Sequence, residues 1–352
     1  MISLAETLLW LCSIPSPIGE EKALCDAVLA RLARVPLAAP IRRYGDSIVV
    51  PLLRSGTKRP HVALVGHFDT VRTKNGPARI EGDRCFGAGA ADMKAGLATM
   101  IVLAETLGED SHADITLVFY AREEGPYAEN ELGVVLAEDP ELAHVDLAVC
   151  LEPSDNHLQL GCCGSIHATV TFHGRSGHSA RPWEGQNAVT MAAPLLGRLM
   201  GLAPVENKID GLVYRTVTTV TQAHDGGRGR NVVPDVFTIN LNHRFAPGTT
   251  PDAAKASIVA LVGSAGEVEF TDVSPAALPN AEHPLVKALL GHDLIVEPKQ
   301  AWTDVARFSA RGIAAVNFGP GESKQAHQPN ESTDIGLLLK GYEILDAWLS
   351  EL

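Results

Sequence analysis

The sequence predicts an α/β fold in which a mostly parallel sheet is interrupted by a smaller α+β module. Up to about residue 160, short apolar runs alternate with helical stretches, which is typical of parallel strands joined by helices that cover both faces. From about residue 164 to 280 the runs alternate or are rich in β-branched residues, as in antiparallel strands with one solvated face. We therefore expect a larger domain formed by residues 1–163 and 281–352 and an inserted domain formed by residues 164–280.

The larger domain is expected to begin with an amphipathic helix within MISLAETLLWLCSIPSPIGEE. This stretch carries Glu6 and lacks the basic start and the small-residue cleavage site of a signal peptide. The most apolar runs predict strands, and the periodic stretches between them predict helices. The expected strands cover residues 47–53, 61–66, 114–121, 145–151 and 313–319, and the expected helices cover 20–35, 93–107, a segment around 129–139, one from about 283 and a closing helix over 332–352.

The inserted domain shows the outline strand–helix–strand–strand–helix–strand, which is that of a small ferredoxin-like α+β module. Its strands are expected over residues 165–174, 212–224 and 235–245, and its helices over residues 187–202 and 250–263. We find no internal repeat and no low-complexity segment in the chain.

Composition excludes several classes of protein. The formal charge of −13 argues against a nucleic-acid partner or an anionic membrane, because phosphate binding needs clustered Lys and Arg. No run approaches the roughly 18 apolar residues that a membrane span needs. The six cysteines are scattered, with one vicinal pair at Cys162 and Cys163, which is not the pattern of a disulfide framework. The expected location is therefore the cytoplasm.

Acidic and imidazole side chains follow four of the expected strands. In open α/β sheets, the loops at the carboxyl ends of parallel strands converge on the binding crevice. A further carboxylate lies in the glycine-rich loop GAGAADMKAG, just before a helix. The residues that we expect to converge are His67, Asp69, Asp92, Glu123, Glu124, Glu152 and His327.

Five acids and two histidines in one place would repel one another unless cations lay between them. Histidines and carboxylates together suit zinc, with cobalt or manganese as alternatives. An aspartate that bridges two ions roughly 3.5–4 Å apart is the usual arrangement for hydrolysis. Of the vicinal pair Glu123 and Glu124, one can bind a metal while the other remains available as a base.

Other interpretations of these motifs are weaker or stay open. The glycines around Asp92 suggest a phosphate loop, but the spacing GxxxxGK[ST] is missing, so a metal loop fits better. In the inserted domain, His178 lies in GRSGHSARPWEGQNA, and a single histidine in a loop is more often incidental than catalytic. Asn231 and Arg244 offer an amide and a cation that suit a substrate carboxylate, although an arginine at a strand end is usually only solvated.

Taken in order, these residues resemble the dinuclear zinc amidohydrolase family of aminoacylases, carboxypeptidases and deacylases. The matching motifs are GHxDxV, GxGxxDxKxG, the EE and EP pairs, GHSARPxxGxNA and the late histidine before an xNE stretch, and they span nearly the whole chain. The resemblance implies two Zn²⁺ ions, with Co²⁺ as a substitute. It implies that His67 and Glu152 bind one ion, that Glu124 and His327 bind the other, and that Asp92 bridges them. Asp69 would hydrogen-bond His67, and Glu123 would be the general base.

The resemblance also assigns roles in the inserted domain, which is similar to the family's lid and dimerisation domain. It implies a homodimer in which His178 of one subunit stabilises the oxyanion in the site of the other. Inside the family, the likeness is closest to the desuccinylases, which implies N-succinyl-L,L-2,6-diaminopimelate as the small-molecule substrate. A deacylase of another acyl-amino acid, such as N-acetylornithine, is the alternative. A non-catalytic metal-binding protein is a third, but it would have no use for a base such as Glu123.

One departure from the family pattern concerns the acyl group. Many desuccinylases carry GRRGS where this chain has GCCGS, and Cys163 cannot replace an arginine that helps to bind a carboxylate. The candidates for binding the substrate are therefore Asn231, Arg244, Thr303 and Arg307.

Overall fold

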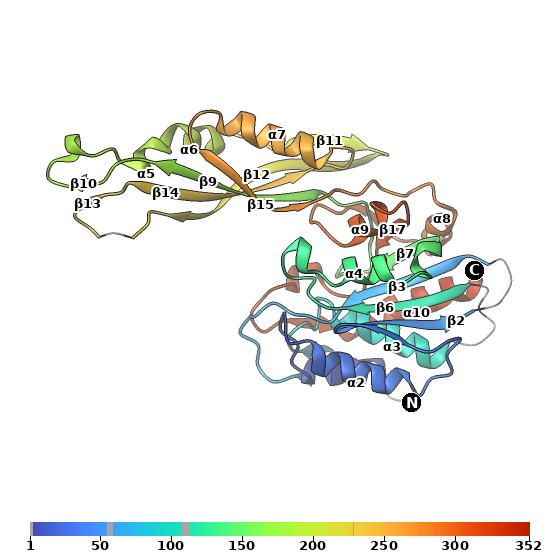
Figure 1. Ribbon diagram of the computed structural model, residues 1–352. Coiled ribbons are helices and arrows are strands. Elements are labelled where there is room, and N and C mark those ends of the chain that lie inside the picture. The colour runs from blue at the N-terminus through green and yellow to red at the C-terminus, as the bar shows by residue number, and fades with distance from the viewer. Residues whose placement is uncertain (1–2, 55–58, 108–110, 112, 228) are drawn as a thin grey trace. The chain divides into compact units, whose positions relative to one another are not determined.

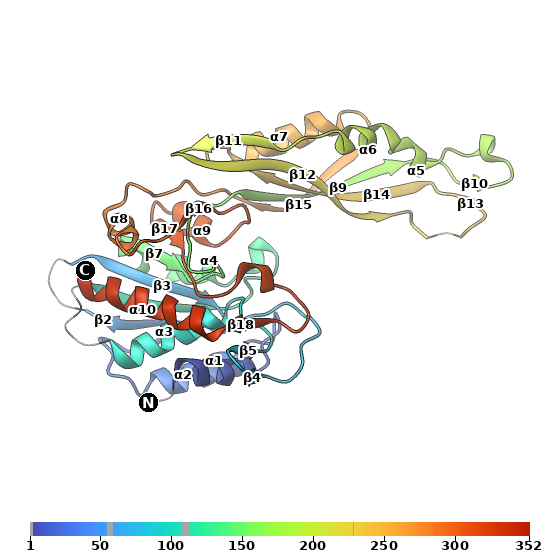
Figure 2. The same ribbon diagram turned by 180° about the vertical axis from the view of Figure 1, so that it is seen from behind.

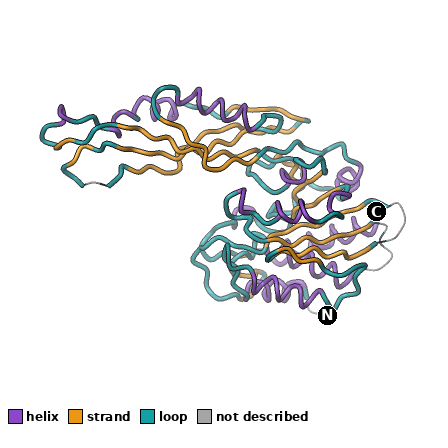
Figure 3. The backbone as a smooth tube through the Cα atoms, viewed as in Figure 1, coloured by secondary structure: helices purple, strands orange, loops and turns teal. Residues whose placement is uncertain are grey.

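The computed structural model describes residues 3–54, 59–107, 111, 113–227 and 229–352, and it divides into two compact units. Unit 1 comprises Met1–Gly161, Pro279–Pro298 and Thr303–Leu352, and unit 2 comprises Cys162–Leu278 and Lys299–Trp302. Each unit has its own sheet, as the strands drawn in Figure 3 show. Among the described residues, no helix is both long and apolar enough to cross a membrane.

Unit 1 is built on an eight-stranded mixed sheet with the order β1-β2-β6-β3-β7-β17-β8-β16. The four neighbours β6, β3, β7 and β17 run parallel, whereas β2 pairs antiparallel with β6, and β8 pairs antiparallel with β17. The strands are β1 (Arg42–Tyr44), β2 (Ser47–Leu53), β3 (His61–His67), β6 (Asp114–Tyr120), β7 (Leu147–Cys150), β8 (Leu158–Leu160), β16 (Val296–Pro298) and β17 (Ala314–Asn317).

Helices cover both faces of this sheet (Figures 1 and 2). On one face lie α1 (Leu4–Ser13), α2 (Lys22–Leu32), α3 (Lys94–Thr106) and α10 (Ile335–Glu351); on the other lie α4 (Leu132–Glu138) and α9 (Val305–Ser309). Because α3 lies between the sheet and both α1 and α10, its residues from Lys94 to Ala104 are all buried. Full burial on both faces explains why β3 is apolar between its two terminal histidines, with no polar alternation.

A small sheet joins two distant segments of unit 1. It has the order β18-β5-β4, formed by β4 (Arg79–Glu81), β5 (Arg84–Phe86) and β18 (Ser332–Asp334). The closing helix was expected from residue 332, but residues 332–334 pair with β5, and Asp334 caps α10 by accepting from the Leu337 N–H. The remaining elements of the unit are α8 (Pro284–Leu290) and the 3₁₀ turns Tyr127–Glu129, Leu142–His144 and Ser323–Gln325.

Unit 2 contains a five-stranded antiparallel sheet with the order β11-β12-β14-β9-β15, covered on one face by three helices (Figure 1). Burial alternates residue by residue along β14, as expected of a sheet with one solvated face. Its elements are β9 (Gly164–His173), β10 (Gly177–His178), a 3₁₀ turn (Pro182–Glu184), α5 (Ala188–Met191), α6 (Ala193–Met200), β11 (Val205–Ile209), β12 (Leu212–His224), β13 (Val232–Val233), β14 (Val236–Phe245), α7 (Pro251–Val262) and β15 (Glu267–Ser274).

The predicted fold class is confirmed, with local differences that have physical reasons. The helix expected over 187–202 is divided at Ala192 into α5 and α6, because Pro194 has no N–H to donate to the preceding turn. The strand over 47–53 is present, and it runs antiparallel to its neighbours β1 and β6. The short strands β1, β4, β5, β8, β10, β11, β13, β16 and β18 were not expected.

Candidate metal centre

The side chains expected to converge are delivered by the four parallel strands in the middle of the unit 1 sheet. His67 is the last residue of β3, Glu123 and Glu124 follow β6, and Glu152 follows β7. The segment that carries His327 follows β17. Because these strands are parallel neighbours, their carboxyl ends lie at one edge of the sheet, where the crevice of an open α/β sheet is found.

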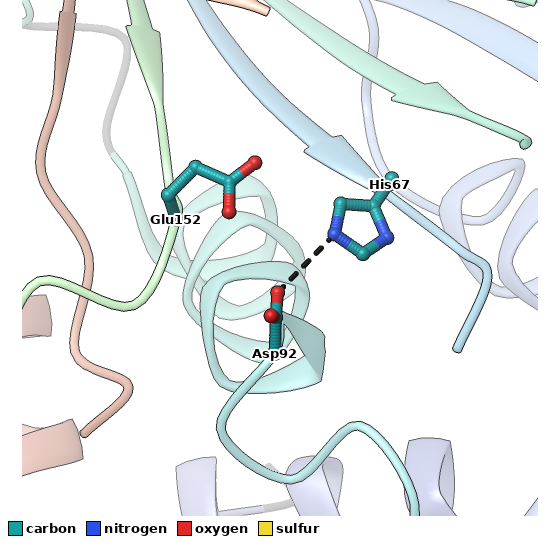
Figure 4. A group of neighbouring side chains, drawn as sticks. All are labelled: His67, Asp92 and Glu152. Carbon is teal, nitrogen blue, oxygen red and sulfur yellow. Dashed lines mark ion pairs between the residues drawn. The ribbon is translucent and has the colours of Figure 1, made fainter. Parts of the chain in front are cut away.

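The structure brings these side chains together in two overlapping groups. One consists of His67, Asp92 and Glu152, and Figure 4 shows the three side chains pointing toward one another. The other consists of Asp92, Glu124 and His327. Within each group the candidate ligand atoms all lie within 4.8 Å of one another. Asp92 belongs to both groups.

The two oxygens of Asp92 face different histidines. Its Oδ1 lies 3.3 Å from Nε2 of His67, and its Oδ2 lies 3.4 Å from Nε2 of His327. The same nitrogen of His327 lies 2.9 Å from Oε1 of Glu124. A carboxylate with one oxygen toward each group is the arrangement that a bridging ligand needs.

His67 presents an unprotonated nitrogen to the first group. Its Nδ1–H donates to the backbone carbonyl of Asp69 at 2.9 Å, which leaves Nε2 without a proton in the neutral ring. Nε2 of His67 and Oδ1 of Asp92 are buried, and neither makes a hydrogen bond of good geometry within the described part of the chain. Buried polar atoms of this kind call for a partner, and a nitrogen–oxygen donor set fits a divalent cation such as zinc.

The ionisation of the cluster reflects its crowding. Burial raises the pKa of the Asp92 carboxyl, but hydrogen bonds from His327 and His67 outweigh it and lower the pKa below its usual range. The same contacts with Asp92 and Glu124 raise the pKa of His327 to about 10. For Glu123, burial and then the charge of Glu152 raise the pKa well above its usual range. A cation would replace the proton on His327, since a ligating imidazole must be neutral.

Asp69 is buried, and its carboxylate holds the backbone of the loop after β6. Its Oδ1 accepts the N–H of Glu123 at 3.0 Å and its Oδ2 accepts the N–H of Glu124 at 2.9 Å. The carboxylate lies 3.5 Å from Nδ1 of His67, farther than the Asp69 carbonyl. Asp69 therefore contacts His67 mainly through its backbone and positions the glutamate pair through its side chain, a role that the sequence did not suggest.

Backbone strain is found beside two of the candidate residues. Arg122, directly before Glu123, has φ +64°, and His327 itself has φ +62°. Side chains other than glycine rarely adopt this left-handed region, and such residues cluster at functional sites. The peptide bond between Asp92 and Met93 is cis.

Glycines allow the segments around the centre to approach closely. A Cβ on Gly321 would lie 2.1 Å from the carbonyl oxygen of Ala91, next to Asp92. A Cβ on Gly319 would lie 2.4 Å from the carbonyl oxygen of Glu152. Both glycines precede His327, so the segment that carries this histidine passes directly against the two loops that carry the other ligands.

Thr303 and Arg307 lie in unit 1, and both are buried. The Arg307 guanidinium donates to Oδ1 of Asp304 at 2.5 Å and to the carbonyl of Tyr127, and it lies over the Tyr127 ring. Asp304 also accepts from the Tyr120 hydroxyl and the Asn130 amide. The donors of Arg307 are thus engaged inside the protein, and its expected contact with a substrate stays a prediction.

The candidate residues of unit 2 lie at two separate places. His178 ends β10, which pairs with β13, and the N–H of the next residue, Ser179, donates to the carbonyl of Asn231 at 2.9 Å. Arg244 lies eight residues beyond Val236, the start of β14, which is roughly 26 Å at ~3.3 Å per residue. The structure therefore places His178 and Asn231 near each other beside the two-stranded sheet β10-β13, and Arg244 toward the far end of β14 in the five-stranded sheet.

The tautomer of His178 follows from one contact. The backbone N–H of Ala180 donates to its Nδ1 at 3.0 Å, so this nitrogen is an acceptor and the proton of a neutral ring is on Nε2. His178 is exposed, and its Nε2–H is oriented as a hydrogen-bond donor.

Glu331 is a contributor that the sequence reasoning missed. It is buried, and its carboxylate accepts the backbone N–H groups of Gly89, Ala91 and Asp92 at 2.8–2.9 Å. Burial raises the pKa of this carboxyl to about 7, although the three N–H groups act in the opposite direction. The only sequence signal was its place in the xNE stretch after His327.

The chain is similar to known proteins over nearly its whole length. The family model described as Peptidase family M20/M25/M40 matches residues 63–351. A relative from Mycobacterium tuberculosis is 36% identical over 342 residues, which are 96% of each chain. A Corynebacterium glutamicum protein named succinyl-diaminopimelate desuccinylase is 35% identical over 349 residues, which are 94% of each chain.

Solved structures show the same fold at low sequence identity. An M20-family metallo-carboxypeptidase from Sulfolobus solfataricus superposes with a TM-score of 0.80 at 16% identity, covering 99% of each chain. A dinuclear metal-binding peptidase of the M20 family from Bacillus subtilis has a TM-score of 0.69 at 12% identity, covering 99% of this chain and 97% of the other. The family match and the relatives above 30% identity confirm the resemblance, and the chain belongs to peptidase family M20/M25/M40.

Proposed function

We propose that the protein hydrolyses the amide bond of N-succinyl-L,L-2,6-diaminopimelate to succinate and L,L-2,6-diaminopimelate, a step in the biosynthesis of diaminopimelate and lysine. The observation that carries the proposal is the pair of donor groups joined by Asp92, with Glu123 beside them. The name of the Corynebacterium glutamicum relative supports the substrate. We place the reaction in the cytoplasm, as expected for a biosynthetic enzyme.

The donor groups suit two Zn²⁺ ions, with Co²⁺ as a substitute. His67 and Glu152 would hold one ion, Glu124 and His327 would hold the other, and Asp92 would contact both. Bound divalent ions supply Lewis acidity, which polarises the scissile carbonyl and acidifies water. The dinuclear centre named for the Bacillus subtilis structure supports two ions, not one.

Glu123 would be the general base. Besides the two groups described above, the structure contains a third group, His67, Glu123 and Glu124, whose candidate ligand atoms also lie within 4.8 Å of one another. Glu123 is in neither of the groups that share Asp92. Its carboxylate takes a proton from water as the water oxygen bonds to the amide carbon, and it then delivers that proton to the nitrogen as the C–N bond breaks. Burial and then the charge of Glu152 raise the pKa of this carboxyl in the metal-free chain, and bound cations would offset the charge of Glu152.

His178 would donate its Nε2–H to the oxyanion in the site of a partner subunit. The wide separation of His178 and Arg244 in unit 2 supports a trans arrangement, because one copy cannot bring both residues to a single small substrate. Unit 2 would then serve as the lid and the dimerisation domain of a homodimer. Asn231 would assist His178, since the two lie next to each other.

Recognition of the succinyl carboxylate would fall to Arg244, with Thr303 and Arg307 as further candidates. Cys163, which stands where many desuccinylases have arginine, packs with Tyr214 and Ala246 in an apolar cluster. Burial raises its pKa to about 12, so it stays a neutral thiol. Arg244 lies close enough to Cys163 for the charge of its guanidinium to act on the thiol, which supports a cation near the position of the missing arginine.

The test is a comparison of two substrates with zinc-loaded protein. N-Succinyl-L,L-2,6-diaminopimelate is expected to be cleaved and N-acetylornithine is not, and Glu123→Gln is expected to abolish cleavage. Cleavage of N-acetylornithine alone would replace the proposal with the deacetylase alternative, and cleavage of neither would overturn the desuccinylase assignment.

A further inference from the structure

We infer, on the basis of the proposed metal centre, that Glu331 is a positioning residue that holds the Asp92 loop and thereby sets the affinity of the centre for metal. The Asp92 loop is defined here as residues 87–93, between β5 and α3. Neither the family match nor the named relatives assign this role to Glu331, and its side chain is in none of the groups that contain the candidate ligands.

Both oxygens of the Glu331 carboxylate are used on this loop. Oε2 accepts from the Gly89 N–H at 2.8 Å, and Oε1 accepts from the N–H groups of Ala91 and Asp92, each at 2.9 Å. Nearby backbone N–H groups that point into one concavity form an anion-binding nest. In this protein the carboxylate of Glu331 fills that nest. One of the three N–H groups that it accepts belongs to Asp92, the residue shared by both ligand groups.

The backbone of Glu331 is itself held in place. Its N–H donates to Oδ1 of Asn75 at 2.7 Å, its carbonyl accepts from the Gly87 N–H at 3.0 Å, and β18 begins at the next residue. Glu331 follows His327 by four residues. One side chain therefore ties the segment that carries His327 to the loop that carries Asp92.

Asp69 offers a direct parallel in the same centre. Its carboxylate accepts two backbone N–H groups from the loop that carries Glu123 and Glu124. The centre thus has two buried carboxylates that act on ligand loops through the backbone. Asp69 was expected near the site because the motif GHxDxV also contains the candidate ligand His67. Glu331 was not expected there, because it is separated by about 240 residues of sequence from the loop that it holds.

Loss of the Glu331 carboxylate is expected to displace Asp92 and so to weaken both ligand groups together. In Glu331→Gln, the amide nitrogen would face backbone N–H donors, so at least one of the three hydrogen bonds is replaced by a repulsive contact. Loss of groups that orient metal ligands typically costs about 10–100-fold in metal affinity. We expect that range for Glu331→Gln and a smaller loss for Glu331→Asp, which keeps the charge but is shorter by one methylene.

Glu322→Gln is the matched control. Glu322 is also buried and lies on the same segment, but its carboxylate pairs with Arg84 and Lys324, and within the described residues it makes no hydrogen bond to the Asp92 loop. Its substitution is expected to lower thermal stability and to leave metal affinity unchanged. The control separates a general loss of stability from a loss of ligand positioning.

The experiment is a calorimetric titration of chelator-treated full-length protein with Zn²⁺, together with the visible absorption of the Co²⁺-loaded form. Weaker binding and an altered Co²⁺ spectrum in Glu331→Gln, with wild-type values in Glu322→Gln, would support the role. Wild-type affinity in a folded Glu331→Gln would overturn it, and if that variant does not fold, wild-type affinity in Glu331→Asp would overturn it instead. A wild-type protein that binds no Zn²⁺ would overturn the proposed centre itself, which distinguishes the two failures.

Discussion

The two units place their functional candidates in contrasting ways. In unit 1, residues from four strands and one loop are brought within a few ångströms, because parallel neighbours end at one edge of the sheet. In unit 2, His178 lies in the two-stranded sheet β10-β13 and Arg244 lies near the end of β14 in the five-stranded sheet, and His178 is exposed. The candidate metal ligands and the proposed base are therefore assembled within one copy of the chain, whereas we propose that the contacts with the acyl group and the oxyanion are shared between two copies.

The largest expected effect tests the base in unit 1. Glu123→Gln should lower kcat by about 10²–10⁴-fold, the usual contribution of a general acid–base group, and should leave zinc stoichiometry unchanged. The measurement is steady-state hydrolysis of the succinyl substrate at full zinc occupancy. Glu129→Gln is the control, since Glu129 is exposed and pairs only loosely with Arg122 at 3.8 Å; equal loss in both variants would remove Glu123 from the proposed role.

The next effect tests unit 2. His178→Ala should lower kcat by about 10²–10³-fold through loss of one oxyanion donor, with little change in stability because the side chain is exposed. His173→Ala is the control, because this histidine is also exposed and lies on β9 of the same unit. Full activity of His178→Ala would show that other groups stabilise the oxyanion.

The trans arrangement is tested by mixing two inactive variants. When Glu123→Gln and His178→Ala are mixed and allowed to exchange subunits, each hybrid dimer contains one intact site, so about a quarter of all sites should become active. Recovered activity is the expected result. If no activity returns although hybrids are detected, His178 acts within its own chain.

A smaller effect concerns the close packing around the centre. Gly321→Ala would place a Cβ 2.1 Å from the Ala91 carbonyl, and we expect a loss of about 1–3 kcal/mol in the free energy of unfolding, measured with denaturant. Gly197→Ala in α6 of unit 2 is the opposite case, because nothing lies within 4 Å of its added Cβ, and a gain of roughly 0.5–1 kcal/mol is expected. A neutral Gly321→Ala would show that the two loops are not in tight contact.

The smallest effect is the pH dependence of the metal-free protein. The pKa of His327 is raised to about 10 in the folded chain from an ordinary value of 6.5, so its protonation stabilises the fold fully below pH 6.5, and this contribution is lost as the pH rises through 10. The Tm of chelator-treated protein should therefore fall from pH 7 to pH 10. His327→Gln should reduce this fall, and a slope equal to that of the wild type would exclude His327 as its source.

Much of the candidate site could be predicted because it depends on local sequence patterns. The run HVALVG marks a buried strand, and His67 directly follows it, so its place at the edge of the sheet follows from strand polarity alone. The same reasoning places Glu124 and Glu152 there. The family resemblance, not the sequence pattern, implied that Asp92 bridges the two ions. In the structure its two oxygens face different histidines, His67 and His327.

The parts that could not be predicted depend on contacts between distant segments. Glu331 and Asp69 act on backbone N–H groups, which carry no sequence signature. The closing helix was expected to include residues 332–334, but these residues pair with β5 as a strand, and α10 begins after them. The antiparallel pairing of β2 with β6 likewise joins distant segments, and an apolar run does not reveal its direction.

The most direct test of the account is the zinc stoichiometry of the wild-type protein and of Asp92→Asn, measured by titration of chelator-treated protein. We expect two ions per wild-type chain and weakened binding of both in Asp92→Asn, because one carboxylate serves both ligand groups. Loss of only one ion in the variant, or a wild-type chain that saturates with a single ion, would contradict a shared Asp92 and the paired centre built on it.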